Sequence, residues 1–328
     1  MVGLHRGEMK LSCVGAGKLA IGVIVLVAGS ALAQQYPVKP VRLFTSDVGG
    51  GSDLAARIIA QGISAPLGQQ VVVENRAGII AIETVSKASA DGHTLLLNGS
   101  IIWIEPLLRD NVPWDSIKAF APITMAAISP NVLVVHPSLP ANSVKDLIAL
   151  ARSRPGALNY ASGAAGTSSH TSGELFKVMA GVDIVRVAYK GTGPAMPDLL
   201  AGQVQLMFIT APGAAPHVKS GRLRALAVTS LQKSALAPNL STVAESGLPG
   251  YQVTTQFAIL APAGTPPAIV NRVNQEVVRF VVRPDIKEKF FNAGLEVVGD
   301  SPEQLAATVR TEINVLGKLI KSAGIRAD

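Results

Sequence analysis

Short apolar segments alternate with helix-like segments along almost all of this 328-residue chain. The strand-like segments are residues 41–44, 71–74, 94–97, 132–135, 185–188, 204–208 and 223–228. The helix-like segments are residues 52–67, 144–152, 172–180 and 195–200. This alternation is typical of α/β proteins, in which each helix carries the chain back to the start of a parallel strand. The pattern therefore predicts an α/β fold with mostly parallel sheets.

Two of the predicted helices carry more detailed signals. Leu54, Ile58 and Ile63 fall roughly on one face of the first helix, so we expect this face to be buried. Ser301 precedes Pro302 near the end of the chain, and Gln304 is placed to complete a capping box with Ser301. The last helix is therefore expected to begin at Pro302.

Residues 1–33 have the composition of an export signal. A basic start is followed by the short apolar run 19–28, and the small residues at 31 and 33 supply a cleavage pattern. A membrane anchor is the rival interpretation, but a bilayer needs about 20 apolar residues. We therefore predict a cleaved leader, a mature chain that starts at Gln34, and a periplasmic location. Cys13, the only cysteine, would leave with the leader, so no disulfide is expected.

The charge of the chain argues against nucleic acid as a partner. Residues 1–33 hold three basic and one acidic residue, which leaves 26 basic and 21 acidic residues and a net charge of +5. The basic residues are scattered, whereas nucleic-acid binding requires a stripe of Lys and Arg. A mildly positive field still favours acidic solutes.

The remaining 295 residues are enough for two domains. Because no low-complexity linker occurs, we expect short strands to join the domains, near residues 132–136 and 227–230. The predicted lobes are residues 34–133 together with 231–328, and residues 134–230.

Two turns rich in glycine and hydroxyl residues lie between strand-like and helix-like segments, at residues 46–53 and 163–170. Such a turn exposes backbone N–H groups at the positive end of a helix, where an anion binds. The first turn, Ser-Asp-Val-Gly-Gly-Gly-Ser-Asp, matches neither a P-loop nor a dinucleotide fingerprint. Two turns of this kind indicate two domains that hold one small anion between them.

The second turn holds three consecutive hydroxyl residues, Thr167, Ser168 and Ser169. Helix capping is the simpler explanation, because Thr171 and Glu174 also fit a capping box. Capping needs only one hydroxyl, so the surplus favours anion binding. A third turn carries Lys190, which either contacts the anion or is simply solvated.

A serine hydrolase is the alternative for the second turn, with His170 as the base. The segment lacks the Gly-x-Ser-x-Gly elbow, and adjacent helix residues do not face each other, which makes His170 a poor base for Ser169. The five histidines show no metal-ligand spacing. We therefore predict no catalytic residue, no metal and no other cofactor.

The chain resembles the periplasmic solute-binding receptors of tripartite tricarboxylate transporters, also called the Bug family. The resemblance spans nearly all of the chain after residue 33, in order. The matching segments are residues 36–42, 49–53, 72–76, 91–96, 166–170, 173–176, 189–195, 223–229 and 260–267. They include Gly-Gly-Gly-Ser-Asp, Gly-Thr-Ser-Ser-His and Tyr-Lys-Gly-Thr-Gly-Pro-Ala.

The resemblance implies a type II periplasmic binding protein, with two α/β lobes joined by hinge strands. Such a receptor closes on a small organic carboxylate and then docks transiently on a membrane carrier or reports to a sensor. It is expected to be a monomer without catalytic activity. The ligand contacts that we expect are Ser46, Asp47, Gly49, Gly50, Ser52, Ser100, Ser162, Gly166, Thr167, Ser168, Ser169, Thr210 and Phe257.

The chain departs from the family pattern at three places. Asp47 puts a carboxylate beside the expected anion site, where it repels a carboxylate ligand unless it pairs with an amine or turns away. The turn at residues 77–82 is shorter than in the family and apolar. Gln205 and Thr210 stand where the family often has acidic or amide side chains. These changes predict a ligand with an apolar or aromatic body, and disfavour amino acids and citrate.

Overall fold

The computed structural model describes residues 2–3, 36–46, 51–76, 79–163 and 165–323. The predicted leader with Cys13, the expected mature start at Gln34, and Asp47, Gly49 and Gly50 of the first turn all lie outside the described residues. Among the helices that are described, none has the length and hydropathy of a membrane span.

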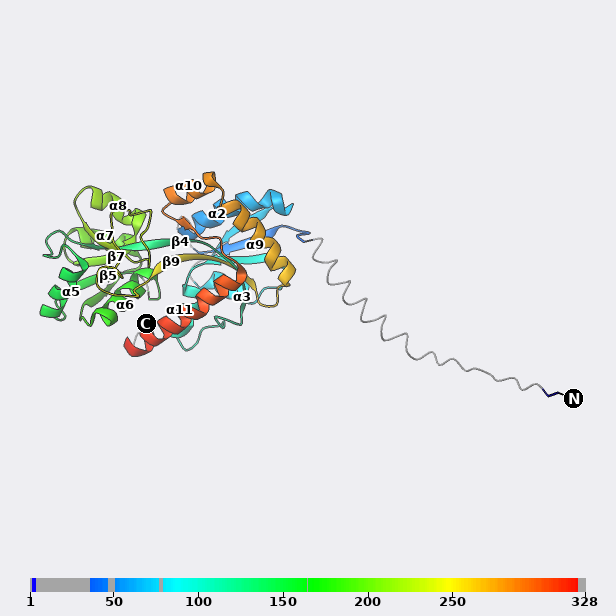
Figure 1. Cartoon of the computed structure of the whole chain (residues 1–328), viewed down its shortest axis with the longest axis horizontal. Coiled ribbons are helices and arrows are strands. Elements are labelled where there is room, and N and C mark those ends of the chain that lie inside the picture. The colour runs from blue at the N-terminus through cyan, green and yellow to red at the C-terminus, as the bar shows by residue number, and fades with distance from the viewer. Residues whose placement is uncertain (1, 4–35, 47–50, 77–78, 164, 324–328) are drawn as a thin grey trace.

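The chain forms two α/β lobes, and the sheets of the lobes are joined through long strands (Figure 1). In the first lobe β1 (Val41–Thr45) lies between β2 (Val71–Asn75) and β3 (Thr94–Asn98), and these three strands are parallel. Strand β9 (Thr254–Pro262) pairs antiparallel with β3 on one side and with β4 on the other.

The second lobe repeats this plan. Strand β5 (Asn159–Ser162) lies between β6 (Val185–Ala188) and β7 (Leu206–Thr210), and the three strands are parallel. Strand β8 (Arg224–Val228) pairs antiparallel with β4.

Strand β4 (Phe120–Val135) belongs to both sheets. Its first part, residues 120–130, pairs with β9, and its last part, residues 131–135, pairs with β7. The short strand β10 (Glu296–Val297) pairs antiparallel with the first part of β4. The prediction of mostly parallel sheets is therefore wrong at the centre. A chain that leaves one lobe along β4 must return along β9 in the opposite direction, so the shared strands are antiparallel.

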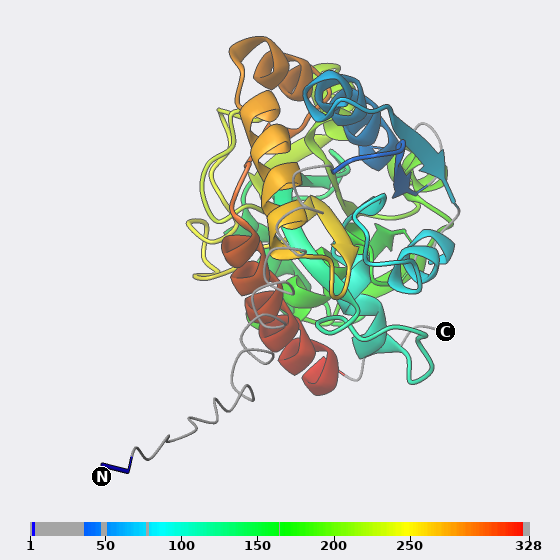
Figure 2. The ribbon, with the colours of Figure 1, turned by 90° about the vertical axis from the view of Figure 1, so that its right-hand side faces the viewer.

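Ten described helices cover the sheets. Those of the first lobe are α2 (Gly51–Leu67), α3 (Ile80–Ser86), α4 (Ile101–Leu108), α9 (Pro267–Val281), α10 (Pro284–Asn292) and α11 (Pro302–Ala323). Those of the second lobe are α5 (Val144–Ser153), α6 (Ser168–Ala180), α7 (Thr192–Leu200) and α8 (Ala211–Lys219). Figure 2 shows α9 and α11 following one another along one side of the molecule. The end of α11 reaches α6 of the second lobe.

The predicted strands and helices are present, and the predicted capping box is confirmed. The Ser301 N–H donates to Gln304 Oε1 at 2.9 Å, and the Gln304 N–H donates to Ser301 Oγ at 3.3 Å. The predicted buried face of α2 is wrong at Leu54, which is 42% exposed. The buried stripe is instead formed by Ala55, Ile59 and Ile63, which recur every four residues, so Leu54 lies one position outside it.

The segment that follows β8 stays beside the second lobe. The Val228 N–H donates to Ser241 O, and the Val253 N–H donates to Thr229 O, both at 2.9–3.0 Å. The chain enters the first sheet only at Thr254. We therefore propose that the second lobe extends from residue 134 to about residue 253, instead of ending at the predicted boundary of 230.

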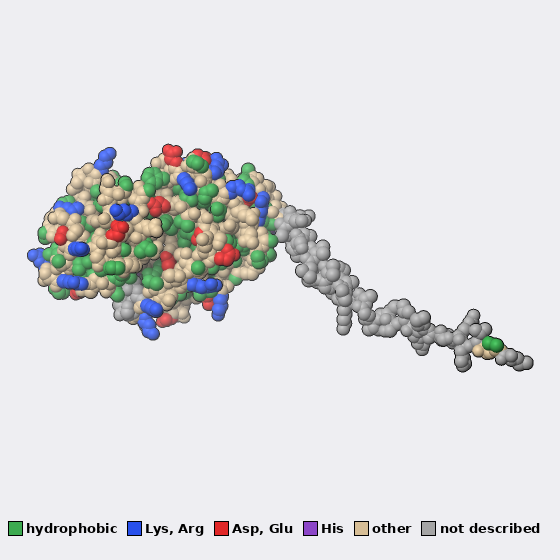
Figure 3. All heavy atoms as spheres, in the orientation of Figure 1, with side chains coloured by type: hydrophobic (Ala, Val, Ile, Leu, Met, Phe, Trp, Pro, Cys, Tyr) green, Lys and Arg blue, Asp and Glu red, His purple; other side chains and the backbone are tan. Residues whose placement is uncertain are grey.

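Charged side chains do not gather on the face shown in Figure 3, where Lys and Arg alternate with Asp and Glu over both lobes. This distribution agrees with the scattered basic residues of the sequence.

Candidate ligand cleft

A cavity of about 450 Å³ lies between the two lobes. Its walls come from the strand-to-helix turns of both lobes and from the strands that join them. The predicted site residues that line it are Ser46, Ser52, Ser100, Gly166, Thr167, Ser168, Ser169 and Thr210. The further lining residues are Asn98, Gly99, Ile101, Asn131, Gly163, Lys190, Gly191, Thr192, Phe208, Thr255 and Gln256.

Five helices begin at this cavity. They are α2, α4, α6, α7 and α8, and each has a lining residue within its first turn or at its N-cap. The cap residues Ser100, Thr167, Gly191 and Thr210 make no side-chain capping hydrogen bond. Because the first N–H groups of a helix lack intrahelical acceptors, these amides need partners from outside the helix. Five convergent N-termini give the cavity a positive potential and suit it to an anion.

The first turn is anchored by Asn75, at the end of β2. Its Nδ2 donates to Ser46 O at 2.8 Å and to Asp53 Oδ1 at 2.9 Å. Asp53 is buried in the first turn of α2, where Arg57 also pairs with it at 2.9 Å. These contacts fix Ser46 and the start of α2 relative to each other.

Phe257 lies beneath this turn and does not line the cavity. The ring is 3% exposed, and a Cβ at Gly51 would stand 3.1 Å from it. The glycine therefore lets the start of α2 approach the ring closely. The sequence predicts Phe257 as a ligand contact because it shows an aromatic residue in a strand. It does not show which face of the strand carries the ring.

The second turn is held by Arg186, the second residue of β6. Its Nε donates to Ser162 Oγ at 2.8 Å, and its terminal nitrogen donates to Gly163 O at 3.0 Å. The Gly163 N–H in turn donates to Ser169 Oγ at 3.0 Å. Ser162 is thus fully buried behind the cavity, where it positions the turn instead of lining it.

His170 has a structural role in this turn. Its Nδ1 accepts a hydrogen bond from the Gly166 N–H at 3.1 Å, and Gly166 adopts a positive φ of 79°. Burial, reinforced by the nearby Arg186, lowers the pKa of His170 to about 4, so the ring is neutral at physiological pH. With Nδ1 occupied by a backbone donor, this arrangement differs from a serine–histidine pair.

Of the hydroxyl residues of the second turn, Ser168 and Ser169 belong to helix α6, and Thr167 is its N-cap. The helix begins at Ser168, four residues earlier than predicted, so Thr171 is not a cap and donates instead to Thr167 O. Glu174 accepts from the Tyr160 hydroxyl, not from an N-cap amide. The capping box suggested for Thr171 and Glu174 is therefore wrong, and capping does not account for the hydroxyls. Ser168 Oγ instead lies 2.7 Å from Thr255 Oγ1 of the joining strand.

Several lining residues were missed by the sequence analysis. Asn98 Oδ1 accepts from the Gly99 N–H at 2.8 Å, and a Cβ at Gly99 would stand 2.7 Å from Gln256 O. Asn131 donates to Ser172 Oγ at 3.3 Å. For Asn98 the available signal was its position at the end of an apolar strand, since ligands bind at the carboxyl ends of parallel strands. Asn131 lies inside the antiparallel strand β4, where no such signal exists.

Lys190 is the one charged side chain among the described lining residues. The apolar surface comes from Ile101 and Phe208. Among the described residues at which the chain departs from the family pattern, Gln205, Ala81 and Ile82 do not line the cavity, whereas Thr210 does. Gln205 Oε1 accepts from the Asn159 N–H, and Ala81 and Ile82 are buried in the core. Residues 77–78 lie outside the described residues.

No group of three or more His, Cys, Asp or Glu side chains is placed to hold a metal ion in the part of the chain that the structure describes. The described walls of the cavity therefore combine backbone amides, hydroxyls, side-chain amides and one lysine with the apolar Ile101 and Phe208.

Residues 55–325 match the family described as tripartite tricarboxylate transporter family receptor. The chain belongs to this family. The protein BugT of Bordetella pertussis is 34% identical to it, over 93% of this chain and 97% of BugT. The structure of Rpa4515 of R. palustris with adipate is 38% identical, with a TM-score of 0.77, and covers 89% of this chain and 99% of that one. MatC of Rhodopseudomonas palustris with bound malate is 28% identical, with a TM-score of 0.72, and covers 87% of this chain and all of that one.

The chain is thus a solute-binding receptor of the TctC and Bug type, with the fold of periplasmic binding proteins. This family and fold are those of substrate-binding proteins and not of enzymes.

Proposed function

We propose that this receptor captures a small organic carboxylate in the cleft, in the periplasm, and delivers it to a tripartite tricarboxylate-type membrane carrier. The observation that carries the proposal is the convergence of five helix N-termini on one cavity. Backbone amides and hydroxyls then bind the carboxylate, and Lys190 adds a positive charge at the second-lobe side. The proposal also includes ligand contacts with Asp47, Gly49 and Gly50 of the first turn.

The ligand has an apolar or aromatic body in this proposal. Ile101 and Phe208 supply apolar surface beside the polar groups, so a chain or ring can be buried while its carboxylate is hydrogen-bonded. The related Rpa4515 was solved with adipate, whose carboxylates flank an aliphatic chain. A dissociation constant near a micromolar corresponds to about −8 kcal/mol, which a few charge-assisted hydrogen bonds and apolar burial supply.

A thermal-shift screen tests this proposal. Adipate, hexanoate, benzoate, citrate and glutamate are added to the purified receptor. A ligand at 100 times its dissociation constant stabilises the fold by about 2.7 kcal/mol, or roughly 5 °C in a protein of this size. We expect adipate, hexanoate or benzoate to raise the midpoint, and the double variant Ser168→Ala, Ser169→Ala to remove the rise.

Two results would contradict the proposal. A rise with citrate or glutamate alone refutes the apolar body. No rise with any acid, when mass spectrometry of the denatured protein finds no copurified acid, refutes carboxylate capture. Exchange of the bound acid into membrane vesicles that contain the carrier distinguishes uptake from an orphan or sensory receptor, which would bind the acid without delivering it.

A further inference from the structure

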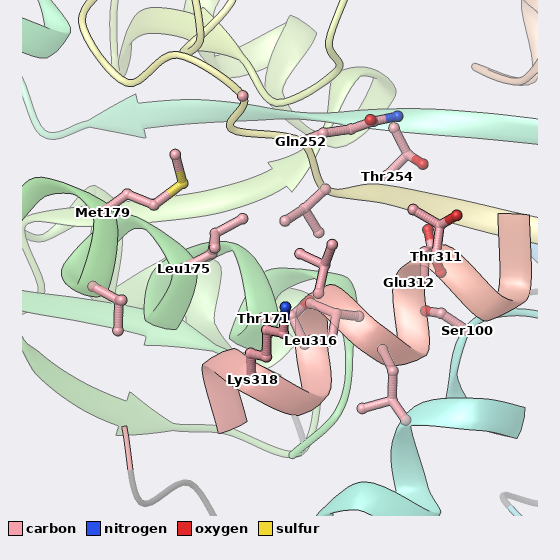
Figure 4. Close-up of a pocket in the computed structure, with 15 residues that line it drawn as sticks. Ser100, Thr171, Leu175, Met179, Gln252, Thr254, Thr311, Glu312, Leu316 and Lys318 are labelled. Carbon is pink, nitrogen blue, oxygen red and sulfur yellow. The ribbon is translucent and has the colours of Figure 1, made fainter. Parts of the chain in front are cut away.

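A second cavity, of about 490 Å³, lies between α4, α6 and α11, and residues 250–254 complete its wall (Figure 4). Helix α6 belongs to the second lobe, whereas α4 and α11 belong to the first. The cavity is open to solvent beside Val178 and Val315, which are 45% and 51% exposed. It shares Ser100 with the ligand cleft but is otherwise lined by different residues.

This second cavity is amphipathic. Its apolar walls are Ile104, Leu175, Val178, Met179, Val253, Val315 and Leu316. Figure 4 shows Leu175 and Met179 toward one end, and Thr254, Thr311 and Glu312 gathered toward the other. A molecule that fills this space therefore has one polar end and one apolar end.

Glu312 sets the chemistry of the polar end. Its Oε2 accepts from Trp103 Nε1 at 2.8 Å, and its Oε1 accepts from Gln256 Nε2. Both donors are neutral, and none of the ion pairs formed between described residues includes Glu312. Burial raises the pKa of this carboxyl, and the hydrogen bonds from Trp103 and Gln256 only partly offset that effect. A half-buried carboxylate with neutral hydrogen-bond donors is less stable than one beside a cation, so a cation that fits the cavity would stabilise its charged form.

Lys318 of α11 also lines the cavity but does not supply that cation. Figure 4 shows it away from Glu312, and no ion pair joins these two described residues. The polar end therefore keeps a carboxyl group and neutral hydroxyls, beside an apolar channel.

We propose that this cavity is a second binding site, which takes a small primary amine with an apolar body. The ammonium group pairs with Glu312 and donates to the hydroxyls of Thr254 or Ser100. The aliphatic or aromatic body lies between α6 and α11, against Leu175 and Leu316.

The two tryptophans of the chain allow a direct test. Trp103 donates to Glu312, whereas Trp114 donates to Ile102 O. The full chain is expressed with 5-fluorotryptophan, and 1-hexylamine is titrated while the two fluorine signals are recorded. We expect the Trp103 signal to shift saturably and more than the Trp114 signal. 1-Hexanol, which has the same body without the charge, should bind at least tenfold more weakly.

Four variants distinguish binding in this second cavity from effects elsewhere in the chain. Glu312→Gln should weaken 1-hexylamine binding at least tenfold and still fold. Among the described residues none donates to Gln256 Oε1, so this oxygen can accept from the new amide once the Gln256 amide turns over. Val315→Phe should narrow the cavity and weaken binding, whereas Val282→Phe, at a position 41% exposed outside the cavity, should not. Thr210→Val, in the ligand cleft, should leave amine binding unchanged.

The proposal is wrong if the Trp103 signal does not move, or if hexanol binds as tightly as hexylamine. It is also wrong if Glu312→Gln or Val315→Phe binds the amine like the unaltered chain while its Trp114 signal shows an intact fold. Loss of amine binding in Thr210→Val would place the amine in the ligand cleft and equally overturn it.

Discussion

The neutral, buried His170 makes the stability of this receptor depend on pH. In the folded chain its pKa is about 4, whereas a histidine in an unfolded chain titrates near 6.5. Between these two values the unfolded chain binds more protons, so stability is lost as pH falls from 6.5 toward 4. For these two pKa values the loss between pH 7 and pH 5 is about 2 kcal/mol.

The variant His170→Asn isolates this contribution. The Asn Oδ1 can still accept from the Gly166 N–H, as His170 Nδ1 does, but the side chain does not titrate. Urea unfolding at pH 5, 6 and 7 is compared between the variant and the unaltered chain. Carboxylates titrate in both, so they cancel in the difference. We expect the unaltered chain to lose about 2 kcal/mol more than the variant between pH 7 and pH 5.

A matched control is His217→Asn, which removes an imidazole from the end of α8, away from the cleft. Equal pH slopes for His170→Asn and the unaltered chain would refute the reasoning, because His170 would then titrate alike in both states. A change of the urea m-value with pH would also invalidate the comparison, since the two-state description would no longer hold.

Three further predictions follow from close contacts around the cleft. Gly173→Ala places a Cβ 2.2 Å from the buried Tyr160 ring, so urea unfolding should show a loss of about 2 kcal/mol, and an unchanged midpoint would contradict this packing. Arg186→Lys cannot reproduce the two guanidinium hydrogen bonds; calorimetry should show about tenfold weaker carboxylate binding, whereas equal affinity would mean that Arg186 does not position the turn. Asn75→Ala leaves buried Asp53 with one hydrogen bond fewer and should lower the unfolding free energy by about 1–3 kcal/mol, and a loss below 0.5 kcal/mol in urea would argue against this anchor.

The sequence predicted the features that depend on neighbouring residues. The alternation of strands and helices and the Ser301–Gln304 capping box are confirmed, because each is decided within a few residues. The hydroxyls at 167–169 line the cleft for the same reason, since a helix start brings them to the end of a strand.

The remaining features depend on strand pairing between distant segments. Arg186 reaches Ser162 only because β6 pairs with β5. Asn75 reaches Ser46 only because β2 pairs with β1. The sequence pattern predicts Gln205 near the cleft, but its side chain accepts a hydrogen bond from the Asn159 N–H of β5. Which face of a strand carries a side chain is decided by such pairing, and one sequence does not reveal it.

Because β4 belongs to the sheets of both lobes, the two sheets can form only in a certain order as the chain is synthesised. Residues 131–135 pair with β7 and β8. Residues 120–130 can pair only with β9 and β10, which are synthesised later. A growing chain thus carries half a strand with an open edge, which is a hazard for aggregation. The second lobe can therefore close around its end of β4 while the first lobe is still incomplete. Residues 120–130 therefore stay unpaired until β9 and β10 join them, even where residues 131–135 already pair within the second lobe.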